Sequence, residues 1–209
     1  YTPKSFGQSL GLNPDDYISL TSYTHHSFYS KFILEVPDNW IWEESYNLPL
    51  EDLARVFAFS IENGYSIAWG ADVSEKGFSY NNGVAVVPEA NTSEMKDSEK
   101  LKWTSMTEKE RQAMLYSFNS PSSEKKITQE LRQVAFDNYQ TTDDHGMLIY
   151  GTAKDQNGKL YYKVKNSWGT DGKFQGNFYA SEAFVLYKTM NIMVHKNAIP
   201  ADIRKKLGI

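Results

Sequence analysis

The sequence predicts a domain of the α+β class, with helices mainly in the middle of the chain and strands in its last third. Residues 47–64, NLPLEDLARVFAFSIENG, repeat apolar side chains at helical spacing. Beyond residue 143, short apolar runs alternate with turn residues, as consecutive strands do. A length of 209 residues fits one ordinary domain or two small ones, and 40% hydrophobic and 14% aromatic residues are enough to build a core.

The first half of the chain contains two clear elements after an irregular start. The first forty-odd residues are rich in Tyr, Ser, His and Trp without clear periodicity, so we expect irregular structure there, with one strand over Phe28–Glu35. The helix in residues 47–64 has Pro49 where a first turn tolerates proline and Gly64 where the helix should stop. Tyr65–Val73 is short and apolar, as a buried strand is.

Residues 91–126 differ in character from the rest. Thirteen charges lie between Glu94 and Lys126, six acidic and seven basic. Thr107 and Glu110 form a capping box that should open a helix reaching about Phe118. A serine- and proline-rich linker follows at 120–123, and a second helix is expected at about 128–139. The region is interpreted as a solvated helical excursion, with a lid or subunit contact as the alternative.

The last third should be mainly β. The expected strands are Gly146–Lys154, Leu160–Asn166, Gly176–Ala180 and Met190–His195. Ser181 can cap a helix after the third of these strands, and a short final helix should begin near Pro200 and stop at Gly208.

Composition and charge do not point to a nucleic-acid, membrane or metal partner. A net charge of -4 gives no reason to expect nucleic acid or an anionic membrane as a partner, and no apolar run approaches the ~20 residues of a membrane span. The sequence has no cysteine, so these residues contain no disulfide, thiolate metal site or thiol nucleophile. His25 and His26 are adjacent and lack zinc-like spacing to other ligands, so no metal site is expected.

Residues 145–170, HGMLIYGTAKDQNGKLYYKVKNSWGT, are predicted to form a hairpin with His145 opening one strand and Asn166 closing the other. A four-residue loop at 155–158 would place Asn166 opposite Met147, with His145 as its diagonal neighbour about 7–8 Å away between backbones. A two-residue turn at Asn157-Gly158 would instead leave the histidine about 13 Å further along the strand. The alternation of side chains permits the first register but does not impose it.

If the two side chains meet, the asparagine oxygen can accept from one imidazole nitrogen and leave the other nitrogen free. That is the role of the orienting member in a nucleophile–base–orienter triad. Trp168 could then cover the hydrogen bond and keep water from it. A polar pair with a purely structural role is the alternative reading of the same residues.

The motifs resemble the C-terminal half of a papain-like cysteine peptidase. The resemblance lies in HGMLIYG, in VKNSWGT with the strand after it, and in Asp144 directly before His145. YTPKSF, AWGADVSEKGF and the excursion before the histidine resemble the bleomycin hydrolase and aminopeptidase C branch. The implied fold is the C-terminal antiparallel β-sheet or barrel half of the papain-like fold, with peripheral helices.

The resemblance implies a role for each matching residue. His145 would be the general base, Asn166 would orient it, and Trp168 would shield the pair. Gly146 would line the substrate cleft beside the strand Ile67–Ala71, and Asp144 would support substrate binding. No cofactor or metal is implied.

The resemblance also implies that a part of the enzyme lies elsewhere. The family's nucleophilic cysteine, with a glutamine before it, opens a helix in the N-terminal half, and neither residue has a counterpart here. We therefore expect residues 1–209 to be the C-terminal half, inactive alone, with a cysteine supplied by sequence before Tyr1.

The expected partners are that N-terminal half, peptide substrates and, by analogy with the branch, further copies in a hexamer. By resemblance to the branch, an aminopeptidase is expected rather than an endopeptidase. The chain stops at IPADIRKKLGI without the branch's closing tail, so an endopeptidase stays open. The alternative is a peptide-binding module that kept the fold and lost the thiol.

Overall fold

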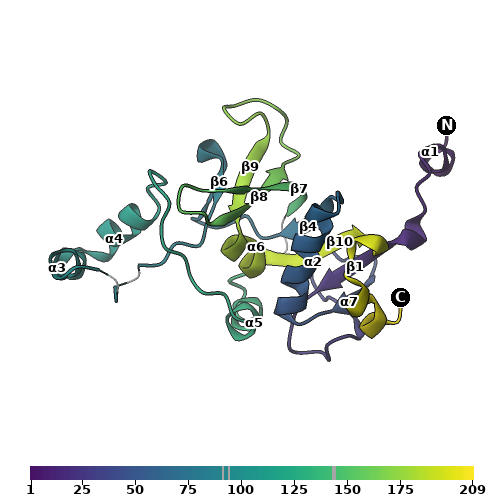
Figure 1. Cartoon of the computed structure of the whole chain (residues 1–209), viewed down its shortest axis with the longest axis horizontal. Coiled ribbons are helices and arrows are strands. Elements are labelled where there is room, and N and C mark those ends of the chain that lie inside the picture. The colour runs from purple at the N-terminus through teal and green to yellow at the C-terminus, as the bar shows by residue number, and fades with distance from the viewer. Residues whose placement is uncertain (91, 94, 143–144) are drawn as a thin grey trace.

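One mixed sheet organises the molecule (Figure 1). The computed structural model describes the chain except residues 91, 94, 143 and 144. Within these described residues, ten strands follow the order β2-β3-β1-β10-β4-β7-β8-β9-β6-β5. The strands are β1 Tyr17–Thr21, β2 Lys31–Ile33, β3 Glu44–Asn47, β4 Ile67–Ala71, β5 Phe78–Ser79, β6 Val84–Ala85, β7 His145–Lys154, β8 Leu160–Lys165, β9 Asn177–Ser181 and β10 Thr189–His195. The α-helices are α1 Pro3–Ser9, α2 Leu50–Glu62, α3 Asp97–Ser105, α4 Glu108–Leu115, α5 Gln129–Asp137, α6 Glu182–Lys188 and α7 Ala201–Leu207.

The α+β class is confirmed, but the sheet is not wholly antiparallel. β1 pairs with β3 in parallel, and β6 pairs with β9 in parallel. The pairings between β1, β10, β4, β7, β8 and β9 are antiparallel. Long connections separate the strands of each parallel pair, as parallel pairing requires.

The expectation of irregular structure at the start of the chain is wrong for residues 3–9 and 17–21, which form α1 and β1, and correct for most of residues 22–43. Thr2 caps α1 through a capping box with Ser5. β1 lies inside the sheet between β3 and β10, and its Leu20 is fully buried. The strand expected over Phe28–Glu35 shortens to β2. β1 has no clear local periodicity. It is stabilised by pairing with β10, which lies about 170 residues further along the chain, so its own sequence need not carry a strong strand pattern.

Helices α2, α6 and α7 form where they were expected and supply the main core. The buried positions of α2 include Leu53, Val56 and Phe57, which repeat at helical spacing. Ser181 caps α6 by accepting the backbone N–H of Phe184, and Gly208 ends α7 with φ +71°. Apolar side chains from the three helices join those of the central strands in one buried cluster.

The charged region contains two helices, α3 and α4, whose described residues include none that is buried. The Thr107 capping box opens α4 as expected, although α4 ends at Leu115 rather than near Phe118. Figure 1 shows both helices standing away from the sheet. The second expected helix is α5, which packs against α6. None of the helices in the described part of the chain is long and apolar enough to cross a membrane.

Candidate active site

The hairpin β7–β8 reaches its register by a route that neither sequence expectation contained. The turn is Gln156-Asn157-Gly158, closed by a backbone hydrogen bond from Asp155 to Lys159 of 3.0 Å, and Gly158 has φ +81°. The adjacent ladder pairs Lys154 with Leu160. Continued without interruption, this ladder would place Asn166 opposite Leu148 and therefore on the wrong face of the sheet.

A β-bulge corrects that register. Between the pairs Gly151↔Lys163 and Ile149↔Val164, strand β7 contains one extra residue, Tyr150. Beyond the bulge Leu148 pairs with Lys165, so the next position places Asn166 opposite Met147. The final pairing is the one expected from a four-residue loop, produced instead by a tighter turn and a bulge.

The side chains of His145 and Asn166 meet across the two strands. Nε2 of His145 lies 2.6 Å from Oδ1 of Asn166, and the backbone N–H of Ser167 donates to the same oxygen at 2.7 Å. A backbone N–H can only donate, so the atom shared by the two contacts is an acceptor. Nε2 of His145 therefore carries a proton, and Nδ1 is the nitrogen left to accept one.

Burial shields the Asn166 side of the pair from water. Asn166 is 3% exposed, so water has little access to its amide. In the part of the chain that the structure describes, its Nδ2 is buried without a hydrogen-bond partner. An unsatisfied buried donor of this kind costs about 1–3 kcal/mol. The fold tolerates this cost while keeping the amide oxygen directed at the imidazole.

Trp168 lies beside the histidine. The two ring centroids are 4.9 Å apart with an interplanar angle of 38°. Phe78 and Tyr80 hold the indole edge-to-face, with centroid separations of 5.9 and 5.1 Å. Trp168 is 49% exposed, so it covers one side of the imidazole and leaves its own outer face in water.

A groove of about 1190 Å³ opens next to the pair. Its walls come from the open face of the sheet, and they include residues of β1, β3, β4, β7 and β10 as well as His145 and Asn166. His145 is the first residue of β7, so its ring lies at the end of the strand, where it lines the groove. The imidazole is therefore accessible from the groove, whereas the amide of Asn166 is shielded from water.

Two glycines form the groove wall next to His145. Gly70 and Gly146 pair with each other across β4 and β7. A Cβ at Gly146 would meet nothing within 4 Å, whereas one at Gly70 would lie 2.3 Å from Oδ1 of Asn191. The Asn191 side chain therefore occupies the space that a larger residue at position 70 would need.

The structure brings together most of the residues singled out from the sequence. His145, Asn166 and Trp168 form one cluster, and Gly146 and strand β4 line the groove. Asp144 lies outside the described residues. Sequence reasoning missed Phe78, Tyr80 and Asn191, which reach the site from distant parts of the chain and carry no local signal. Among the described residues, no group of three or more His, Asp or Glu side chains could hold a metal ion.

A model of the Peptidase C1-like family matches residues 80–208, which include the whole His145–Asn166–Trp168 cluster. The chain belongs to this Peptidase C1-like family. Aminopeptidase C of Streptococcus thermophilus is 25% identical over 208 residues, covering 96% of this chain and 40% of that protein.

The solved structure of PepW from Lactobacillus rhamnosis HN001 matches the entire Peptidase C1-like chain. Its TM-score is 0.67 at 19% sequence identity, and the match covers 42% of the PepW chain. The match confirms the papain-like α+β architecture. The Peptidase C1-like chain thus spans about two fifths of the length of these two proteins.

Proposed function

We propose that this chain supplies the histidine and asparagine of a cysteine peptidase whose thiol comes from polypeptide outside the 209 residues. The observation that carries the proposal is the 2.6 Å contact between His145 Nε2 and Asn166 Oδ1 at the edge of an open groove. The contact fixes a tautomer with Nδ1 as the available base, which is what thiol activation requires.

The chemistry follows from that tautomer. Nδ1 takes the proton of a cysteine thiol, and the imidazolium remains hydrogen-bonded to Asn166 through Nε2. The thiolate attacks the peptide carbonyl, and the imidazolium returns the proton to the departing amine. A water molecule then attacks the thioester with Nδ1 as base, which releases the acid and restores the thiol. Asparagine suits this cycle because the thiolate already provides the negative charge that balances the imidazolium.

Two facts support placing the thiol outside these residues. The 209 residues contain no cysteine, and the related Aminopeptidase C is about two and a half times as long as the matched segment. The chain alone is therefore proposed to be inactive, with the groove receiving the missing half and the substrate. Removal of N-terminal residues is the proposed mode, because that is the activity in the relative's name.

The first test uses the complete polypeptide, meaning this chain together with the sequence that precedes it in the gene. A peptide bearing a thiol-reactive epoxide should label one cysteine of that protein and abolish hydrolysis of an aminoacyl fluorogenic amide. His145→Ala should abolish labelling at neutral pH, whereas His26→Ala should leave it intact, since His26 is exposed and stacks on Phe32 away from the pair. Hydrolysis by the 209 residues alone, unaffected by thiol alkylation, would contradict the proposal.

Gly146 provides a test of the groove. Because a Cβ at this position meets nothing, Gly146→Val should fold normally while narrowing the wall beside His145. We expect KM to rise, with labelling by a small electrophile such as iodoacetamide unchanged. An unchanged KM would mean that the substrate lies elsewhere.

A non-catalytic peptide-binding module is the competing function, favoured by the lack of cysteine in the chain. It predicts peptide binding by the complete polypeptide without turnover and a residue other than cysteine at the upstream helix start. Reading that stretch of the gene separates the two functions directly.

A further inference from the structure

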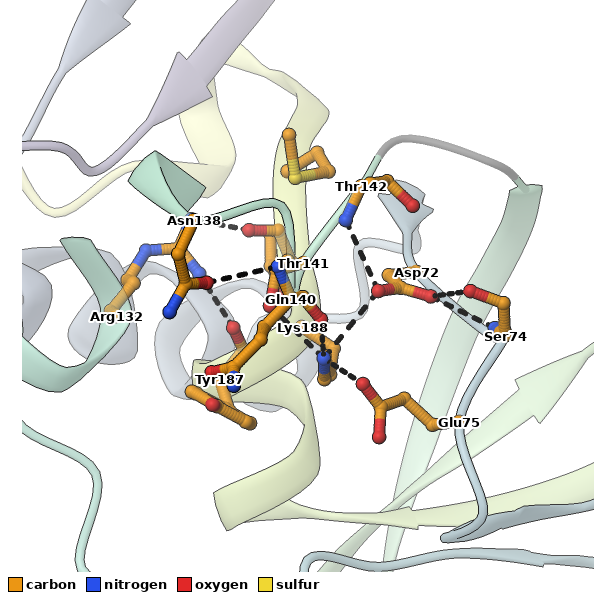
Figure 2. A network of polar contacts seen from close by, with 12 residues as sticks. Asp72, Ser74, Glu75, Arg132, Asn138, Gln140, Thr141, Thr142, Tyr187 and Lys188 are labelled. Carbon is orange, nitrogen blue, oxygen red and sulfur yellow. Dashed lines mark hydrogen bonds and ion pairs between the residues drawn. The ribbon is translucent and has the colours of Figure 1, made fainter. Parts of the chain in front are cut away.

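A cluster of charged side chains, centred on the buried pair Asp72 and Lys188, contacts residues 140–142, which precede His145 in the sequence (Figure 2). The proposed chemistry does not use this cluster. Lys188 is 1% exposed and Asp72 is 2% exposed. Their side chains approach within 3.4 Å, and the backbone N–H of Asp72 donates to the carbonyl of Lys188 at 3.1 Å. The pair therefore joins the end of β4 to the end of α6 through both backbone and side chains.

Lys188 holds the segment that leads into β7. Its Nζ donates to the carbonyl of Gln140 at 2.6 Å and to the hydroxyl of Thr141 at 3.0 Å. It also donates to the carboxylate of Glu75, which covers the cluster from the side of the 72–75 loop. Figure 2 shows the amino group between the two carboxylates and the 140–142 segment. An ammonium so deeply buried needs these partners, because desolvation of the charge is otherwise costly.

Asp72 holds the same segment from the other side. Its Oδ2 accepts the backbone N–H of Thr142 at 3.1 Å, and its Oδ1 accepts the backbone N–H and the hydroxyl of Ser74 at 2.8 and 2.7 Å. Burial by itself raises the pKa of the Asp72 carboxyl. The hydrogen bonds from Ser74 and Thr142, with the charge of Lys188, outweigh burial and lower that pKa below its ordinary value. The carboxylate is thus ionised at neutral pH.

The location of the pair connects it to the histidine. Ala71, the residue before Asp72, pairs with His145 across β4 and β7. Thr142, which Asp72 binds, precedes His145 by three residues. The two charged side chains therefore hold residues 140–142, which precede β7, and Asp72 directly follows the residue that pairs with His145, the first residue of that strand.

We propose that Asp72 and Lys188 are positioning residues for His145: by clamping residues 140–142, they hold the start of β7 so that the imidazole reaches Asn166. The inference rests on the proposed function only for the role of His145 in catalysis. Neither charged group touches the imidazole, so both act through the backbone. Breaking the clamp should loosen the contact between His145 and Asn166 while leaving the sheet intact.

The test is an NMR measurement on the 209-residue chain, which needs no thiol and no substrate. The Nε2–H proton of His145, assigned with His145→Gln, should be visible in wild type because Asn166 binds it. In Lys188→Met the proton should exchange with water about tenfold faster or disappear, because local opening exposes it. Ile203→Ala, a buried substitution in α7, is the matched control: it lowers global stability without touching residues 140–142 and should keep the signal.

A second variant covers the case in which Lys188→Met does not fold. Thr141→Val removes only the hydroxyl that accepts from Lys188 and keeps the volume of the side chain. It should speed the exchange of the His145 proton more than Ile203→Ala does. If the folded variants show the same His145 signal and exchange as wild type, the pair is structural only and the inference is overturned. Absence of peptidase activity in the complete protein would leave this result untouched, so the two failures are distinguishable.

Discussion

Replacing Asn166 with alanine should separate orientation of the histidine from stability of the fold. The substitution removes the oxygen that accepts from His145 and from the backbone of Ser167, at 2.6 and 2.7 Å. Each net hydrogen bond is worth about 0.5–1.5 kcal/mol. Ser167 is exposed, so its N–H regains water in the variant.

The variant also loses a group that was costing free energy. The buried Nδ2 of Asn166, unpartnered among the described residues, costs about 1–3 kcal/mol. The two effects oppose each other, so the free energy of unfolding should fall by only about 0–2 kcal/mol. The catalytic loss should be larger, because a disoriented base forfeits much of the ~10²–10⁴-fold contribution of general acid–base catalysis. We expect kcat/KM of the complete protein to fall by about 10²-fold.

Two measurements check this expectation. Urea denaturation of the 209-residue chain gives the free energy of unfolding, and NMR gives the Nε2–H signal of His145. Asn166→Asp keeps an acceptor oxygen in place and should retain that signal, whereas Asn166→Ala should lose it. If Asn166→Ala keeps the signal, or loses activity only in proportion to its stability, the orienting role assigned to the amide is wrong.

Three further substitutions probe the groove, the indole and the fold. Gly70→Ala should destabilise the chain by no more than about 1 kcal/mol in urea denaturation, because its Cβ would displace only the flexible end of the half-buried Asn191 side chain, and in an Asn191→Ala background it should cost nothing further. Trp168→Ala should cost about 0.5–1.5 kcal/mol, because the indole is half exposed, but should accelerate exchange of the His145 proton; unchanged exchange would show that the indole does not shield it. Asp52→Asn should lower Tm by about 3–8 °C at pH 7 and by less at pH 3. Burial raises the pKa of Asp52, but hydrogen bonds from a tyrosine and two basic side chains outweigh it and lower that pKa, so the stabilisation is present above about pH 4 and is lost as pH falls through the folded-state pKa. An equal difference in Tm at both pH values would refute that account.

The helices that were predicted correctly are those whose local sequence contains a recognisable helix signal. The helix α2 has helical periodicity, α4 has a capping box, and α6 has Ser181 before its first turn. These features act over three or four residues, so they can be read from the sequence alone. β1 was missed because a strand of five residues has little intrinsic preference and is stabilised by the strands beside it.

The candidate site also combines features that the sequence predicts with features that only the paired strands decide. The sequence determined that a histidine opens one strand, that an asparagine follows its neighbour, and that a tryptophan comes two residues later. Whether the first two meet depended on the turn at 156–158 and on the bulge at Tyr150, whose combined register is a property of the paired strands. Local preference left both registers open, because a shift of one residue changes the face of every side chain without changing the sequence pattern.

The sequence by itself determined the residue types, their order and the helices and strands that local chemistry encodes. Only the tertiary structure decided the contact between His145 and Asn166, the groove across the open sheet face and the clamp formed by Asp72 and Lys188. The physical reason is distance along the chain: these contacts join segments 21 to 116 residues apart. Packing of the whole sheet against its helices, rather than any local pattern, brings such segments together.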